Sequence, residues 1–214
     1  SHEAKQALNE LCEAYWRPIY AEIRRRGHTP ADAQDLTQEF MARLLRQNSF
    51  GRAEESKGRF RSYLLGALDY FLANHLRDQR AQKRGGGMEI VSLDAEEAES
   101  WFALLPADGA TPAEAFDHGW TMLLMDRALA ALEAEYGERG QATVFGMLKP
   151  FLATDAGVDG YAETAAQAGM TENSFRVAVH RLRKRFRQCV REQVEVTVAD
   201  PADTDAEMRH LFGF

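Results

Sequence analysis

The side chains best suited to bind a ligand lie between residues 171 and 187, and they suit DNA. Polar and basic residues recur there on one face of an expected helix, and an apolar arc containing Phe175, Leu182 and Cys189 lies opposite. Such a face can read base edges in the major groove while arginine and lysine bind phosphates. The alternative is a solvated basic helix without a ligand. The candidates are Asn173, Ser174, Arg176, Val177, His180, Arg181 and Lys184.

A support for this helix is predicted immediately before it. Residues 161–168 are mostly small, Gly169 provides a turn, Met170 an apolar plug and Thr171 an N-cap. These parts in this order are typical of a helix-turn-helix, which places its second helix in the major groove of DNA.

A second basic segment carries aromatic residues. On a helix over 59–83, leucines and Phe71 form a buried arc, while arginines and tyrosines fall on the other side. Rings stack on unpaired bases and arginine binds phosphate, so we expect this helix to hold a single strand. The alternative is that Tyr63 and Tyr70 pack against the preceding helix. The candidates are Arg59, Arg61, Tyr63, Tyr70, Asn74, Arg77, Arg80, Lys83 and Arg84.

An acidic stripe runs along an expected helix over 30–47. Asp32, Asp35 and Glu39 share one face, Arg43 lies one turn further on, and Gln38 precedes Glu39. Such a stripe is either ordinary solvated surface or a contact for a partner.

The elements that must position these faces are helices. Alanine, leucine, glutamate and arginine dominate, β-branched residues are sparse and apolar residues recur at helical spacing, so the predicted fold class is all-α. We expect helices over 4–26, 30–47, 59–83, 120–136, 141–153, 160–168 and 171–193, and a last helix over 203–212.

The charge pattern divides the chain. The net charge is -7, and residues 88–126 contain no lysine or arginine, although basic segments lie on both sides. This pattern predicts two small helical domains, residues 1–87 and 119–193, joined by an acidic flexible linker over 88–118 and followed by a tail over 194–214.

Other functions find little support in the sequence. The histidines are dispersed without metal-ligand spacing or a nucleophile motif, so we expect no enzyme, no metal site and no cofactor. Cys12 and Cys189 lie far apart, which argues against zinc and disulfides. Residues 85–87 are three glycines, but they lack the ending of a phosphate loop. The sequence contains no apolar run long enough to span a membrane and no signal peptide, so we expect a cytoplasmic protein without a membrane partner.

The order of these parts resembles an extracytoplasmic-function (ECF) sigma factor of the sigma-70 class. The stretch DAQDLTQEF at 32–40 is similar to region 2.2 of that family, and FRSYLL at 60–65 is similar to the opening of region 2.3. Residues 161–182 resemble region 4.2, so the likeness covers nearly the full chain.

The resemblance implies a bacterial transcription initiation factor that binds core RNA polymerase and promoter DNA. The acidic stripe with Gln38 and Arg43 would contact the coiled coil of the β′ subunit, and the C-terminal domain would contact the β flap. The basic-aromatic helix would melt and hold the minus-ten element, and the helix-turn-helix would read the minus-thirty-five element. The acidic linker would run through the nascent-RNA path.

The chain departs from the family pattern at Gln34, Thr37, Tyr63, Tyr70 and Asn74. Together with residues 81–87 and the tail, these departures resemble a subgroup of the family whose members are encoded beside Ser/Thr kinases. We hypothesise that such a kinase phosphorylates Thr37 and thereby restores negative charge for polymerase binding. Thr37 falls nearly opposite the acidic stripe, so the alternative is that it only borders the apolar face. The alternative function is a helix-turn-helix regulator that binds duplex DNA without polymerase.

Overall fold

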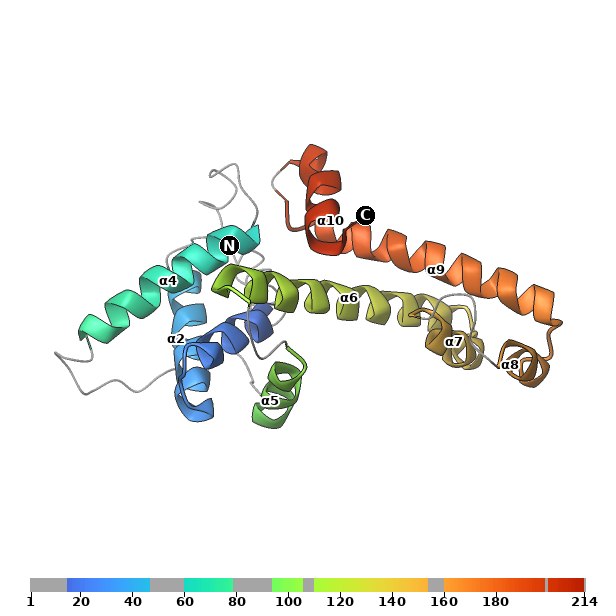
Figure 1. The fold of residues 1–214 in the computed structure, drawn as a ribbon, viewed down its shortest axis with the longest axis horizontal. Coiled ribbons are helices and arrows are strands. Elements are labelled where there is room, and N and C mark those ends of the chain that lie inside the picture. Colours follow the sequence, from blue (N-terminus) through green and yellow to red (C-terminus); the bar gives the residue numbers. More distant parts are fainter. Residues whose placement is uncertain are drawn as a thin grey trace. The chain divides into compact units, whose positions relative to one another are not determined.

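The computed structural model describes residues 15–46, 60–78, 94–105, 110–153, 160–198 and 200–213. Every regular element in these residues is a helix, so the predicted all-α class is confirmed (Figure 1). The chain divides into two compact units, which are Ser1–Leu123 with Thr197–Phe214, and Leu124–Val196. Within the described ranges, no helix has the length and apolar character needed to cross a bilayer.

The first unit contains the predicted helices of the N-terminal half and the tail. Its helical segments are residues 15–25, α2 Pro30–Arg46, α4 Phe60–Asp78, α5 Ala95–Ala103, the beginning of α6 Pro112–Glu138, the 3-10 turn η2 Pro201–Asp203 and α10 Thr204–Phe212. The last helix lies where the sequence predicts it.

Aromatic packing builds the core of this unit. Trp120 of α6 is 0% exposed, and its ring stacks on Tyr15 with ring centroids 4.7 Å apart. Phe60 and Phe116 complete the cluster around it at 6.0 and 6.1 Å. Large rings buried together remove much apolar area from water, so this cluster holds α4 and α6 against the first helix.

Helix α6 begins eight residues before the predicted start at 120. Thr111 and Glu114 cap it reciprocally, because the Thr111 amide donates to the Glu114 carboxylate at 2.8 Å and the Glu114 amide donates to the Thr111 hydroxyl at 3.3 Å. Pro112 occupies the first helical position, which suits its fixed φ. The sequence TPAE carries this capping box, so the earlier start was readable and the prediction was wrong there.

The acidic segment also contains a helix that was not predicted. Asp94 accepts hydrogen bonds from the amides of Glu96 and Glu97 at 2.9 and 3.0 Å, which starts α5. Trp101 of α5 is buried in a cluster with Ala21 and Leu105. The expectation of a flexible linker over 88–118 is therefore wrong for its described part.

Gly119 of α6 permits the close packing of Trp101. A Cβ built on Gly119 would lie 3.1 Å from the Trp101 ring, which is tighter than ordinary contact. A larger residue would push α5 away from α6.

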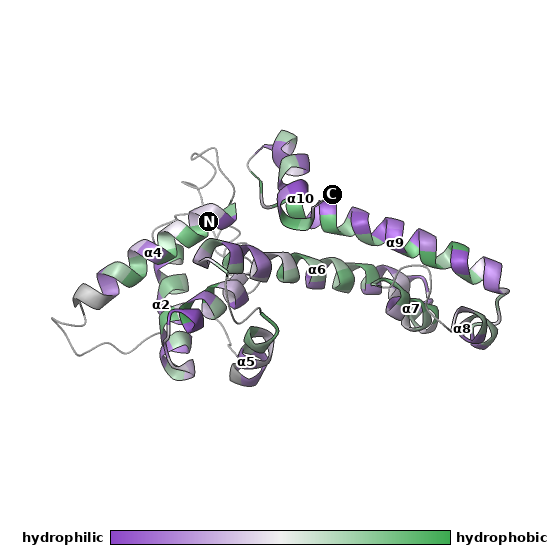
Figure 2. Cartoon of the chain, in the orientation of Figure 1, coloured by the Kyte–Doolittle hydropathy of each residue, from purple (hydrophilic) through white to green (hydrophobic). Residues whose placement is uncertain are grey.

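The second unit consists of the rest of α6, α7 Ala142–Leu148, the 3-10 turn η1 Lys149–Phe151, α8 Tyr161–Gln167 and α9 Glu172–Glu195. Phe151, Tyr161 and Phe175 form its aromatic centre, with ring centroids 4.6 to 5.9 Å apart. Hydrophilic and hydrophobic positions alternate along α9 (Figure 2), so this helix packs on one side and leaves the other to solvent.

Candidate nucleic-acid interface

Helix α9 begins where the sequence predicts. Thr171 has extended backbone, and its hydroxyl accepts a hydrogen bond from the Ser174 amide at 3.2 Å. Gly169 has a φ of +67°, a left-handed conformation that favours glycine, and forms the turn between α8 and α9. The Met170 amide donates to the Ala165 carbonyl at 2.8 Å. These contacts set the direction in which α9 leaves the turn.

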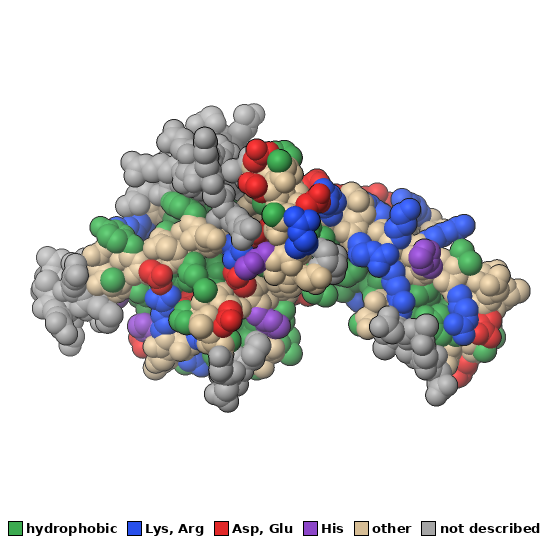
Figure 3. All heavy atoms as spheres, turned by 45° about the horizontal axis from the view of Figure 1, so that its top comes forward, with side chains coloured by type: hydrophobic (Ala, Val, Ile, Leu, Met, Phe, Trp, Pro, Cys, Tyr) green, Lys and Arg blue, Asp and Glu red, His purple; other side chains and the backbone are tan. Residues whose placement is uncertain are grey.

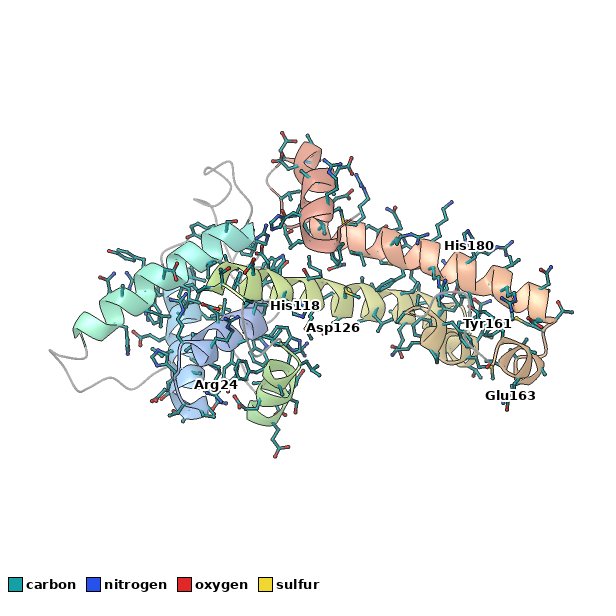
Figure 4. All side chains as sticks on the ribbon, in the orientation of Figure 1. Arg24, His118, Asp126, Tyr161, Glu163 and His180 are labelled. Atoms are coloured by element: carbon teal, nitrogen blue, oxygen red, sulfur yellow. The ribbon has the colours of Figure 1, made fainter. Side chains whose placement is uncertain are left out.

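The exposed face of α9 carries every residue predicted to contact the minus-thirty-five element. The buried face comprises Phe175, Val179, Leu182, Cys189, Val190 and Val194. Lysine and arginine side chains gather with a histidine over this helix (Figure 3). His180 projects from α9, and Tyr161, the first residue of α8, lies next to α9 (Figure 4). The exposed candidates are Asn173, Ser174, Arg176, Val177, His180, Arg181 and Lys184.

Arg176 is held in place before any DNA binds. Its guanidinium lies over the Tyr161 ring at 4.5 Å from the centroid, and it donates to the Glu172 carboxylate at 2.7 Å. The ring and the carboxylate restrict the rotamers of this long side chain, which lowers the entropy lost on binding.

Two other arginines of α9 hold the fold together. Arg183 donates to the Phe151 carbonyl at 2.8 and 3.0 Å. Arg185 binds Glu135 of α6 and Glu192, and these hydrogen bonds lower the pKa of both carboxyls. Both guanidinium groups are therefore engaged within the second unit.

Helix α4 presents one exposed aromatic ring. Tyr70 is 65% exposed, and the Arg43 guanidinium of α2 lies 5.7 Å from its ring centroid. Asn74 donates to the Tyr70 carbonyl at 2.9 Å, while Tyr63 is half-buried. Tyr70 is thus open to a stacking base on the helix where the sequence predicts single-strand binding.

Arg61 does not share this exposure. It is 6% exposed, and its Nε donates to Glu207 of α10 at 2.6 Å. Its Nη1 also pairs with Asp117 of α6. The sequence predicted Arg61 among the residues that bind DNA, and in this structure other side chains of the chain occupy its guanidinium.

The structure does not describe the side chains of the other candidates of this basic segment. Arg59, Arg80, Lys83 and Arg84 lie outside the described residues. Arg77 belongs to α4, but its side chain is not described.

The acidic stripe of α2 faces solvent. Asp32, Asp35 and Glu39 are exposed, and Gln38 and Arg43 are half-buried. The Thr29 hydroxyl donates to Asp32 at 2.8 Å and accepts from the Asp32 amide at 3.2 Å, which caps the helix. Glu39 approaches His75 of α4 with its oxygen 3.4 Å from Nδ1.

Thr37 lies on the inner side of α2. The residue is 0% exposed, and its hydroxyl donates to the Ala33 carbonyl at 2.7 Å. A kinase cannot reach this hydroxyl while α2 keeps its packing. Of the two interpretations of Thr37, the structure thus favours the one that places it at the apolar face.

Contacts between α5 and the first helix were missed at the sequence level. Glu99 accepts from Arg24 at 2.6 and 3.0 Å and from the Tyr20 hydroxyl, and Glu97 pairs with Arg17. The Arg24 hydrogen bonds lower the pKa of Glu99, whereas burial and Glu99 together raise the pKa of Tyr20 to about 12. Opposite charges at 17, 24, 97 and 99 were the available signal, but nothing in the sequence aligns segments this far apart.

Comparison with known proteins identifies the helices of the N-terminal part of the chain. Residues 11–82 match the family model described as Sigma-70 region 2. This match includes α2 and α4, which carry the acidic stripe and the exposed Tyr70. No curated protein and no solved structure matches the chain.

Proposed function

We propose that this chain, which its region 2 domain places among the sigma-70 family sigma factors, directs RNA polymerase to promoters through two DNA contacts. Region 2 implies binding to core RNA polymerase and a role in transcription initiation. Sigma factors are not enzymes, so the family confirms that part of the sequence prediction. In this proposal the chain works beside core polymerase in the cytoplasm.

The observation that carries the upstream contact is the exposed face of α9 behind a glycine turn. Six polar or basic side chains and the apolar Val177 lie on it, and the buried face packs on Phe151 and Tyr161. We assign residues 119–193 to a region 4 helix-turn-helix that reads the minus-thirty-five element and contacts the β flap. Arg176, already oriented by Tyr161, is the best placed to read a guanine.

The downstream contact uses α4. The exposed Tyr70 ring offers a base a stacking surface, and Arg43 beside it offers a positive charge for the backbone. Tyr63, Asn74, Arg77 and the basic residues beyond α4 extend this single-strand surface in the proposal. The minus-ten element of the open promoter is its ligand.

The polymerase contact uses the acidic stripe of α2. Asp32, Asp35 and Glu39 are exposed together, so they can pair with basic side chains of the β′ coiled coil. For residues 88–118 to follow the nascent-RNA path, α5 must first release Arg17 and Arg24. The pairs are partly solvated and cost little to break, but the buried Trp101 must also be exposed, so polymerase binding has to compensate that cost.

Run-off transcription with core polymerase tests the proposal. The parent is expected to start transcripts at specific promoters, and Arg181→Ala is expected to reduce them about tenfold by losing a groove contact. Arg139→Ala is the matched control, because Arg139 is an exposed arginine of the same unit that does not belong to α9. Equal loss with both variants, or no stimulation by the parent, would contradict the proposal.

Asp35→Asn tests the polymerase contact separately. We expect it to weaken binding to core polymerase about threefold, with duplex DNA binding unchanged, because a rim charge is removed. Asp126→Asn, at an exposed aspartate of α6, is the control for the same charge change.

Membership of the ECF subgroup associated with Ser/Thr kinases is also part of the proposal. Because Thr37 is buried, phosphorylation there requires α2 to open first. In a kinase-proficient cell, Thr37→Val keeps the shape without the hydroxyl and should lose kinase-dependent transcription. If Thr37→Val, Thr37→Ala and Thr37→Glu all transcribe like the parent, the kinase switch is wrong.

A further inference from the structure

The C-terminal segment, residues 197–213, packs against the other helices of the first compact unit. The Phe60 amide at the start of α4 donates to the Thr197 carbonyl at 3.2 Å. On α10, Thr204, Glu207 and Met208 are buried, and they recur at the spacing of one helix face. The hydrogen bond at Thr197 and the buried face of α10 therefore both anchor the segment within the first unit.

A charged residue lies in the middle of this buried face. Glu207 is 1% exposed, and a buried carboxylate is costly unless a positive partner compensates it. Arg61 is that partner at 2.6 Å, and it also pairs with Asp117. His210 of α10 binds the other oxygen of Asp117 at 2.7 Å, so four side chains form one continuous network.

The segment is also acidic as a whole. Between residues 197 and 214 it carries Asp200, Asp203, Asp205 and Glu207 against a single arginine. Glu207 therefore presents to Arg61 the kind of charge that a backbone phosphate of a nucleic acid presents.

We propose that the C-terminal segment is an internal competitor of single-stranded DNA, in which Glu207 occupies Arg61 in place of a backbone phosphate. Docked, the segment withholds Arg61 from the strand. When a strand binds α4, α10 leaves and the Arg61 guanidinium pairs with a phosphate instead. This inference rests on the proposed single-strand contact of α4 and adds the device that restrains it.

The test measures the affinity of the full chain for a fluorescent single-stranded oligodeoxynucleotide of mixed sequence, by anisotropy. Glu207→Gln is expected to bind at least about threefold more tightly than the parent, because one charge-assisted contact to Arg61 is weakened. Asp203→Asn removes the same charge from an exposed position of the segment and is expected to change affinity less than about twofold. The double variant Arg61→Gln with Glu207→Gln should lose the gain.

Hydrogen exchange of the parent gives a second reading that needs no variant. Saturating oligonucleotide is expected to speed exchange of the α10 amides while those of α2 stay protected. A tail with only a structural role would keep its protection. This reading decides the matter if Glu207→Gln fails to fold.

Any one of the following outcomes would overturn the inference. These are equal affinities of Glu207→Gln and the parent, equal gains with Glu207→Gln and Asp203→Asn, or α10 protection that saturating oligonucleotide leaves unchanged. If neither the parent nor Glu207→Gln binds the strand, the inference also fails. Run-off transcription by the parent then judges the proposed function separately.

Discussion

The two compact units present their basic side chains in different ways. In the second unit, the candidate DNA contacts of α9 all lie on one solvent-facing side, opposite Phe175 and Leu182. In the first unit, α4 leaves Tyr70 exposed but has Arg61 bound to α6 and α10. Helix α9 packs along one face, whereas α4 is contacted by the first helix, α2 and the C-terminal segment. Helical periodicity predicts exposure well only in the first situation.

The largest effect is expected from removing the centre of the second unit. Phe175 is fully buried between Phe151 and Tyr161, so Phe175→Ala should cost about 3 to 5 kcal/mol of unfolding free energy and abolish duplex binding. Urea denaturation measures the loss. Amide exchange of α2 and α4 should stay near that of the parent, and their loss of protection would show that the two units do not fold separately.

Arg61→Ala should rank next and affects the other unit. Truncating one partner of a buried ion pair leaves Glu207 uncompensated, so we expect a loss of about 3 kcal/mol. Arg181→Ala, at an exposed arginine, should stay within about 0.5 kcal/mol of the parent. Similar losses for the two variants in denaturation experiments would remove the contrast between the units.

The salt dependence of duplex binding tests which side chains of α9 contact phosphates. If Lys184 contacts a phosphate, Lys184→Ala should reduce the slope of log affinity against log salt by about 1. Arg185→Ala should leave the slope unchanged, since that guanidinium pairs with Glu135 and Glu192. A larger slope change for Arg185→Ala would mean that its internal pairs open on DNA.

The smallest effect is expected when the pH is lowered. The hydrogen bonds from Arg24 lower the pKa of Glu99, so the stabilisation from this pair is present above the ordinary value of 4.5 and is lost as the pH falls below it. The amide signals of α5 in NMR spectra should therefore shift below about pH 4.5. Glu99→Gln should reduce this shift, and an unchanged shift would assign it to another carboxyl of α5, such as Glu96 or Glu97.

Local signals in the sequence were enough for several elements. Thr171 and Gly169 set the start of α9, and Thr29 set the start of α2, because caps and turns involve neighbours a few residues away. The same kind of signal at Thr111 and Glu114 marked the start of α6 and was overlooked. The linker predicted over 88–118 includes Pro112, which instead occupies the first turn of α6.

The sequence by itself determined the helical class, the amphipathic face of α9 and the likeness of residues 32–40 and 60–65 to region 2, since all of these depend on residue type and short spacing. Only the tertiary structure decided that Arg61 meets Glu207, that Arg24 meets Glu99 and that Thr37 is buried. The first two contacts join residues 146 and 75 positions apart. Any exposed arginine could pair with many carboxylates in such a charged chain, and packing selects the one that is close enough.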